Sequence, residues 1–291
     1  MHSYLRWTFE GRASRWLYVV GLLFLIAFLH YGGMPLVFLV RLLGDSSQWP
    51  PLVAYVVNHL PLVIFLIAAP LWVQVVHKRP WWTVAFPRLA LEAWNLGIGA
   101  LFALLAIVVT WTFYTTVLGI SITPGSPDPA TYWPSFVFAL AFVFMQTTSE
   151  ELVHRGYAMQ AVRRFTASPI AIVVLSALLF AIPHYDNVVG LGWPWWGILS
   201  YAAPAVLFAW MVLRTGSLWM PIGWHWLNNF VLGRVLVVKA DLTGAGSAFL
   251  YADRYPPLEM TLLTQTVVFF LMAVAINHLV SQRARASESV G

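Results

Sequence analysis

The chain has 291 residues and a net charge of +5; 60% of the residues are hydrophobic, only 9% are charged, and cysteine is absent. A soluble domain carries about 25% charged residues, so this composition excludes a water-covered surface and predicts an integral membrane protein. The missing cysteine excludes disulfides and thiolate chemistry, and the basic residues are scattered over short loops, which fits orientation in a bilayer better than nucleic-acid binding.

In chain order, the first 15 residues are polar, basic and aromatic, which predicts a helix lying on the membrane surface rather than a cleaved signal peptide. A membrane-crossing helix needs about 20 apolar residues. Eight stretches qualify, and we predict an all-α polytopic membrane protein with a single transmembrane domain over 1–291. The predicted spans are 16–40, 52–76, 95–118, 132–152, 168–190, 194–213, 216–235 and 258–280.

The 16 lysines and arginines give the orientation, because cytoplasmic loops carry an excess of them. With the N-terminus inside, the side facing away from the cytoplasm holds four: Arg41, Arg234, Lys239 and Arg254. The other twelve fall on the cytoplasmic side: Arg6, Arg12, Arg15, Lys78, Arg79, Arg88, Arg155, Arg163, Arg164, Arg214, Arg283 and Arg285. Both termini are therefore expected in the cytoplasm.

The stretch "QTTSEELVHRGYAMQ" places two adjacent acids after a long apolar run. Ionisable groups inside a membrane cost about 2.5–3.5 kcal/mol each and point to function. Glu151 and Arg155 are four apart in the favourable order for a helical ion pair. Glu150 points about 100° away, which leaves it available as a general base; the alternative is a charge cluster that caps the helix. His154 is three and four residues from the two acids and could be their hydrogen-bond partner.

Two later spans carry further polar residues. His184 lies in "LSALLFAIPHYDN", four residues after Phe180, and "MPIGWHWLNNF" puts His225 and Asn229 one helical turn apart. Asn228 is expected on another face. His30 and His59 also lie within spans, but no carboxylate is near them in the sequence, so we interpret them as packing residues.

These residues together resemble a known pattern. "EELVHR", "FAIPH" and "HWLNN" match EExxxR, FxxxH and HxxxN, in the order found in the CPBP family of intramembrane proteases, the CAAX-protease and bacteriocin-processing (Abi) group that includes the type II CAAX prenyl endopeptidases. The family core would cover about residues 130–235. The resemblance implies a hydrolase that cleaves a membrane-associated peptide or protein substrate within the lipid bilayer.

The resemblance also implies roles for single residues. Glu150 would activate the attacking water with help from His184. His225 and Asn229 would stabilise the oxyanion, and Glu151 and Arg155 would organise the site. The favoured mechanism is glutamic and needs no cofactor; a zinc site formed by Glu150, His184 and His225 is the alternative. Glu150 lies near the cytoplasmic end of its predicted span, whereas His184 lies well inside the next one. We therefore predict that the fourth helix continues beyond Arg155, so that the two side chains meet at one depth in the cytoplasmic half of the membrane.

Other functions stay open. A non-catalytic membrane scaffold or bacteriocin-immunity protein could keep the same fold. A transporter is also conceivable, but the sequence offers no second polar cluster in residues 16–120. The family's eukaryotic members remove the last three residues of prenylated proteins. If the chain is prokaryotic, it would sit in the plasma membrane, and secreted peptides or sorting tails become the candidate substrates.

Overall fold

The computed structural model describes residues 14–32, 61–84, 89–238 and 249–288, with single positions between 33 and 60. The predicted surface helix at 1–15 lies almost wholly outside these residues. Parts of the spans 16–40 and 52–76, and residues 239–248 of the loop after the seventh span, lie outside them too.

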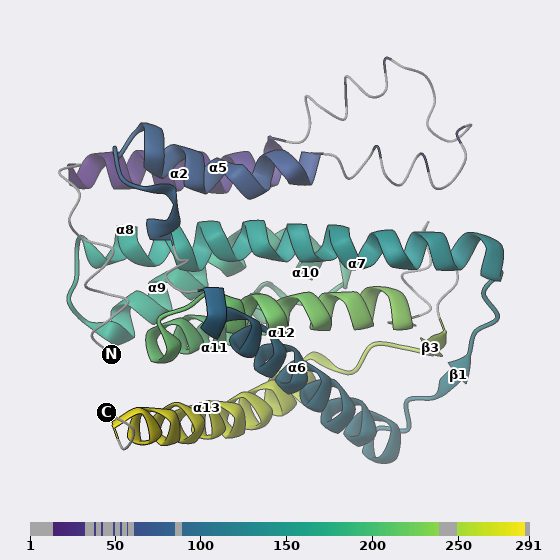
Figure 1. Ribbon diagram of the computed structural model, residues 1–291. Helices are drawn as coiled ribbons and strands as arrows, with labels where there is room; N and C mark the ends of the chain where they lie inside the picture. Colours follow the sequence, from purple (N-terminus) through teal and green to yellow (C-terminus); the bar gives the residue numbers. More distant parts are fainter. Residues whose placement is uncertain are drawn as a thin grey trace.

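The described chain is a bundle of apolar helices (Figure 1). Five helical stretches are long and apolar enough to cross a bilayer: Ala93–Val117, Tyr132–Arg163, Pro169–Gly190, Trp195–Thr215 and Leu258–Arg283. Two shorter apolar helices lie at Arg15–Tyr31 and Val63–Val75. The chain is therefore an all-α, multi-pass membrane protein, as predicted. The count of eight spans and the cytoplasmic termini remain predictions.

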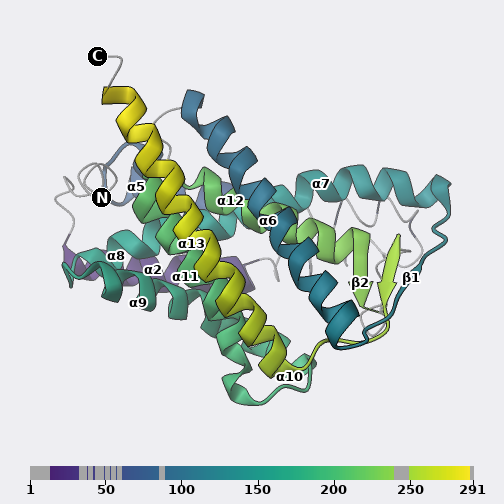
Figure 2. The ribbon, with the colours of Figure 1, turned by 90° about the horizontal axis from the view of Figure 1, so that it is seen from below.

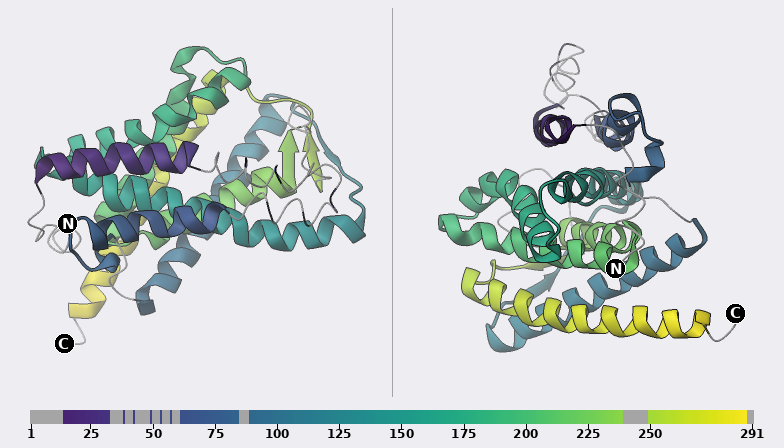
Figure 3. Two further views of the ribbon diagram at one scale, coloured as in Figure 1. Left: turned by 90° about the horizontal axis from the view of Figure 1, so that it is seen from above. Right: turned by 90° about the vertical axis from the view of Figure 1, so that its left-hand side faces the viewer.

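The helices stack in layers, which the end-on view in Figure 3 shows most clearly. α2 (Arg15–Tyr31) and α5 (Pro61–Val75) form one outer layer. Next come α7 (Pro129–Glu151), α8 (Met159–Arg163) and α9 (Pro169–Ala181), followed by α11 (Leu199–Thr215) and α12 (Trp219–Phe230). α6 (Leu89–Val117) and α13 (Leu258–Glu288) cover the opposite side. The motif-bearing helices therefore lie inside the bundle.

The fourth span continues past its charged motif, as the shared site requires. α7 begins at the Asp128 cap with Pro129 in its first turn, a favourable start for a helix. It runs into a π-helical segment, η3 (Leu152–Ala158), all of it buried, and then into α8. A π segment within a helix frequently marks a functional site. Here Gly156 allows η2 (Trp81–Val84) to approach, because a Cβ at Gly156 would lie 2.7 Å from the Val84 carbonyl oxygen.

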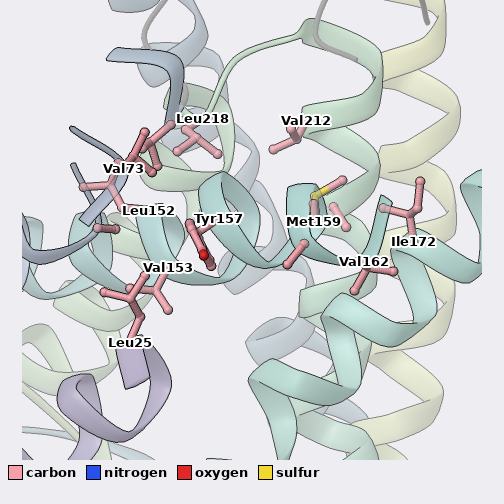
Figure 4. Packing of buried hydrophobic residues seen from close by; sticks show 14 of the residues in the cluster. Leu25, Val73, Leu152, Val153, Tyr157, Met159, Val162, Ile172, Val212 and Leu218 are labelled. Atoms are coloured by element: carbon pink, nitrogen blue, oxygen red, sulfur yellow. The ribbon is translucent and has the colours of Figure 1, made fainter. Parts of the chain in front are cut away.

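The largest core cluster lies where α2, α5, η3, α8, α9, α11 and α12 meet. Figure 4 shows Leu152, Tyr157 and Val212 of this cluster packed among neighbouring helices. α6 and α12 approach even more closely: a Cβ at Gly223 would overlap the Leu96 carbonyl oxygen, and one at Gly99 would overlap that of Met220. Small residues at such crossings let membrane helices pack backbone to backbone.

The bundle has two chemically different ends. We call one the basic end, because eight described basic residues lie at or beside its turns and helix ends: Arg15, Lys78, Arg79, Arg163, Arg164, Arg214, Arg283 and Arg285. The other, the sheet end, comprises residues 118–128, 191–194, 236–238 and 249–257. There β3 (Leu250–Ala252) pairs antiparallel with β1 (Ile122–Pro124) and parallel with β2 (Leu236–Val238). Figure 2 shows these strands far from the C-terminal end of α13.

A hydrogen-bonded cluster ties the basic end together. The Tyr157 hydroxyl lies 2.8 Å from Nε2 of His77, and the Trp72 indole donates to the same nitrogen at 3.2 Å. The Arg79 guanidinium donates to the Tyr18 hydroxyl at 2.9 Å. Polar groups removed from water need such partners, so α2, α5 and η3 are joined by polar contacts as well as by packing.

Candidate active site

The charged motif at the end of α7 forms the predicted ion pair. Arg155 Nη1 donates to Glu151 Oε1 at 3.0 Å, and both side chains are fully buried. The guanidinium carbon lies 4.3 Å from the ring centre of Phe180 and 5.0 Å from that of Phe208. Cation–π contacts of this kind are strongest when desolvated. Glu151 and Arg155 are therefore held rigidly by charge and by packing.

His225 of α12 lies between the two glutamates. Its Nδ1 is 2.9 Å from Glu151 Oε1, and its Nε2 is 3.8 Å from Glu150 Oε2. Glu151 Oε1 already accepts from Arg155, so Nδ1 of His225 is the donor and Nε2 faces Glu150. The sequence placed His225 one helical turn from Asn229 but did not indicate a contact with Glu151. In the structure, Glu151 orients the imidazole of His225, although the two residues are 74 positions apart in the chain.

Glu150 takes no part in the buried ion pair, as its position on the helix predicted. Its Oε1 accepts a hydrogen bond from Gln146 Nε2 at 3.1 Å, one turn earlier in α7. The side chain is buried but reaches the cavity described below. Of the two acids, Glu150 is therefore the one placed to meet a ligand.

His184 stands where its helix is interrupted. Pro183 cannot donate a backbone hydrogen bond, and the chain tightens into η4 (Ile182–His184) before α10 (Tyr185–Gly190). His184 Nδ1 donates to the Phe180 carbonyl at 2.8 Å, and its ring stacks on Tyr201 with 5.0 Å between centroids. When Nδ1 of a neutral imidazole donates, Nε2 carries the lone pair. Nε2 of His184 is therefore the ring atom that can accept a hydrogen bond from a ligand.

One cavity of about 460 Å³ brings these side chains together. The cavity is lined by the four residues to which the resemblance assigns roles in the reaction: Glu150, His184, His225 and Asn229. The motifs FxxxH and HxxxN therefore meet Glu150 at one cavity, as expected. Asn228 lines it too, which corrects the expectation that it faces away. Its Nδ2 donates to Asn229 Oδ1 at 3.3 Å. The cavity wraps around the end of α12, so adjacent positions both reach it.

Two further histidines lie close to the site. His30 of α2 meets the ring of His184 edge-on at 5.9 Å between centroids, and it lies 6.4 Å from His154. His154 is fully buried, and neither ring nitrogen has a hydrogen-bond partner, so it does not bridge the acids. No local pattern could have identified His30, because its neighbours are more than 120 residues away in the chain.

The alternative zinc site can be compared with this arrangement. Among the described residues, no group of three or more His, Cys, Asp or Glu side chains is arranged to hold a metal ion. Nδ1 of His184 and Nδ1 of His225 contact the Phe180 carbonyl and Glu151, which leaves only the two Nε2 atoms to face a ligand. Histidines that bind zinc often carry hydrogen bonds of this kind, so the zinc site stays an alternative, and we derive no chemical step through a metal.

Comparison with known proteins agrees with the ordered motifs. Residues 132–231 match the family model of the type II CAAX prenyl endopeptidase Rce1-like proteins. The chain is also similar to the uncharacterized protein YyaK of Bacillus subtilis (strain 168), with 23% identity over 290 residues, covering 95% of this chain and 96% of the relative. Glu150, His184, His225 and Asn229 all lie within the matched range. Over residues 132–231, the chain is therefore similar to the Rce1-like family of type II CAAX prenyl endopeptidases, in agreement with the resemblance of its motifs.

Proposed function

We propose that the protein is an intramembrane endopeptidase in which Glu150 activates the water that attacks a peptide bond. The observation that carries the proposal is the placement of His225, 2.9 Å from Glu151 and 3.8 Å from Glu150, at the wall of a cavity shared with His184 and Asn229. The family match supports peptidase chemistry at this location.

The proposed first step uses two acceptors. Glu150 takes one proton from water, and Nε2 of His184 accepts a hydrogen bond from the second proton, which orients the oxygen toward the substrate. As the water oxygen bonds to the carbonyl carbon, the carbonyl electron pair moves onto its oxygen. A general base of this kind contributes about 10²–10⁴ in rate.

The oxyanion then needs preorganised donors. We assign this role to the amide group of Asn229 and to Nε2 of His225 when that nitrogen carries a proton. Glu151 and Arg155 position His225 through the hydrogen bond at Nδ1. In the second step, the proton held by Glu150 passes to the amide nitrogen as the carbon–nitrogen bond breaks, which regenerates the carboxylate.

The test is cleavage of a library of peptides with apolar segments by the purified protein in lipid vesicles. Mass spectrometry in H₂¹⁸O identifies new carboxyl termini that carry the label. Glu150→Gln should lower cleavage by about 10²-fold or more, while its thermal unfolding midpoint stays near that of the wild type. Glu259→Gln, at an exposed position of α13, is the matched control and should keep full activity.

Three other results would point elsewhere. Unchanged cleavage by Glu150→Gln would remove Glu150 from the mechanism. Loss of wild-type cleavage with a zinc chelator, restored by zinc, would favour the metal alternative. If the wild type cleaves no member of the library, and Glu150→Gln complements every cellular phenotype of a deletion, the scaffold or immunity hypothesis would replace the peptidase.

A further inference from the structure

The cavity at the candidate site extends toward one end of the bundle. Its wall consists of the motif residues, rings beside them such as Phe208 and Trp224, and several segments at or near the sheet end. These segments are the last turns of α6 around Tyr114, the turn after α10 around Trp193, the first turns of α11 around Tyr201, and the positions Pro256, Thr261 and Gln265 where the chain enters α13. The motif residues stand at the inner end of this passage.

In the part of the chain that the structure describes, packed side chains fill the opposite direction. Behind His225 lies the fully buried pair Glu151–Arg155, with Phe180 and Phe208 against the guanidinium. Beyond this pair lies the largest core cluster, including Leu152 and Leu218 (Figure 4). Protein interiors of this kind are packed as densely as organic crystals, so a peptide cannot reach Glu150 through the basic end without unpacking the core.

The charges give the orientation of these two ends. Of the described basic residues at helix ends and turns, eight lie at the basic end, whereas the sheet end holds Arg234 and Arg254. Arg254 is partly neutralised by Asp253, with Nη1 3.1 Å from Oδ2. By the positive-inside rule the basic end faces the cytoplasm, which places the sheet end on the extracytoplasmic side.

We infer that the substrate enters from the extracytoplasmic side. It would be an exported peptide or the extracytoplasmic end of a membrane-anchored segment. The inference rests on the proposed peptidase function for its chemistry, but the side of entry follows from packing and charge alone.

The wall of the cavity also narrows the chemistry of the substrate. Among the described lining residues none is Lys or Arg, and Glu150 is the only acid. Aromatic rings alternate with amides, and the Oε1 of Gln265 is buried without a hydrogen-bond partner. Such a wall suits an extended, uncharged segment, whose apolar side chains meet the rings and whose backbone N–H groups meet the amides. An acidic residue beside the scissile bond would be repelled by Glu150.

The absence of cysteine makes the side of entry directly measurable. Asn187→Cys places one thiol at an exposed position on the cavity wall near the sheet end, and Ala167→Cys places one at an exposed turn of the basic end. In intact cells, a membrane-impermeant maleimide should label Asn187→Cys and spare Ala167→Cys. After permeabilisation both should react. Labelling of Ala167→Cys alone in intact cells would overturn the inference.

A second readout links entry to cleavage. In purified protein, a bulky maleimide adduct at Asn187→Cys should lower cleavage of an uncharged library peptide at least tenfold, whereas the adduct at Ala167→Cys should leave it unchanged. Equal cleavage by both adducts would overturn entry along this wall. Labelling needs no activity, so the two proposals can be refuted separately. The labelling pattern can contradict the inferred side of entry while Glu150→Gln still abolishes cleavage. Conversely, the peptidase proposal can be refuted while the labelling pattern agrees with entry from the extracytoplasmic side.

Discussion

Replacing Arg155 tests whether the buried ion pair supports the site. Arg155→Met removes the cation that lies 3.0 Å from Glu151 while keeping much of the apolar contact with Phe180 and Phe208. Glu151 is fully buried, so its charge would be left uncompensated. Removing one partner of a buried pair costs about 3–5 kcal/mol. We expect a loss of that size in the free energy of unfolding, measured by denaturant titration in mixed micelles with tryptophan fluorescence.

The double variant Glu151→Gln/Arg155→Met separates charge from packing. It removes both charges, and the glutamine oxygen can still accept from His225 Nδ1, so most of the lost stability should return. The matched control is Arg254→Met, which breaks an exposed pair of similar length, 3.1 Å, and should cost less than about 1 kcal/mol. The reasoning is refuted if Arg155→Met costs no more than Arg254→Met, or if the double variant is as unstable as the single one.

Three further predictions concern the oxyanion, helix packing and pH. Asn229→Ala should lower kcat by about 10²–10³ with little change in KM; an equal loss in Asn228→Ala would assign the role to the amide pair rather than to Asn229. Gly223→Ala should destabilise the protein by about 1–3 kcal/mol, because the added methyl group overlaps a carbonyl oxygen of α6. Gly97→Ala is the control and should not destabilise the protein, because open space surrounds Gly97. Equal shifts of the thermal unfolding midpoint in the two variants would contradict this prediction. Burial beside two arginines lowers the pKa of His77 to about 4, below the ordinary value near 6.5, so the stability it contributes is present above pH 6.5 and is lost as pH falls toward 4. Thermal unfolding of His77→Gln should therefore depend less on pH over that range, and identical profiles would argue against it.

The local part of the site could be predicted because it depends on helical spacing. Glu151 and Arg155 are one turn apart, and the low dielectric of a membrane interior makes pairing the natural outcome for two such charges. The same argument left Glu150 outside the pair, which the structure agrees with. The continuation of the fourth helix beyond Arg155 also followed, since the polar residues there could be shielded only inside a bundle.

The contacts between helices could not be predicted in this way. His30 lies against His184, and His225 donates to Glu151, across more than 70 residues in each case. Asn228 reaches the cavity because the cavity wraps around the end of α12. These neighbours depend on crossing angles and depths, which no periodicity in a single segment encodes.

The sequence by itself determined that the chain lies in a membrane, that its motifs resemble those of an endopeptidase family, and which acid pairs with Arg155. Those conclusions need only composition and spacing within one helix. The tertiary structure decided which imidazole is oriented by Glu151, which amides join the site, and that the cavity extends toward the sheet end while the core closes the basic end. The physical reason is that a cavity is the space left between packed helices, and its shape is a property of the packing rather than of any one segment.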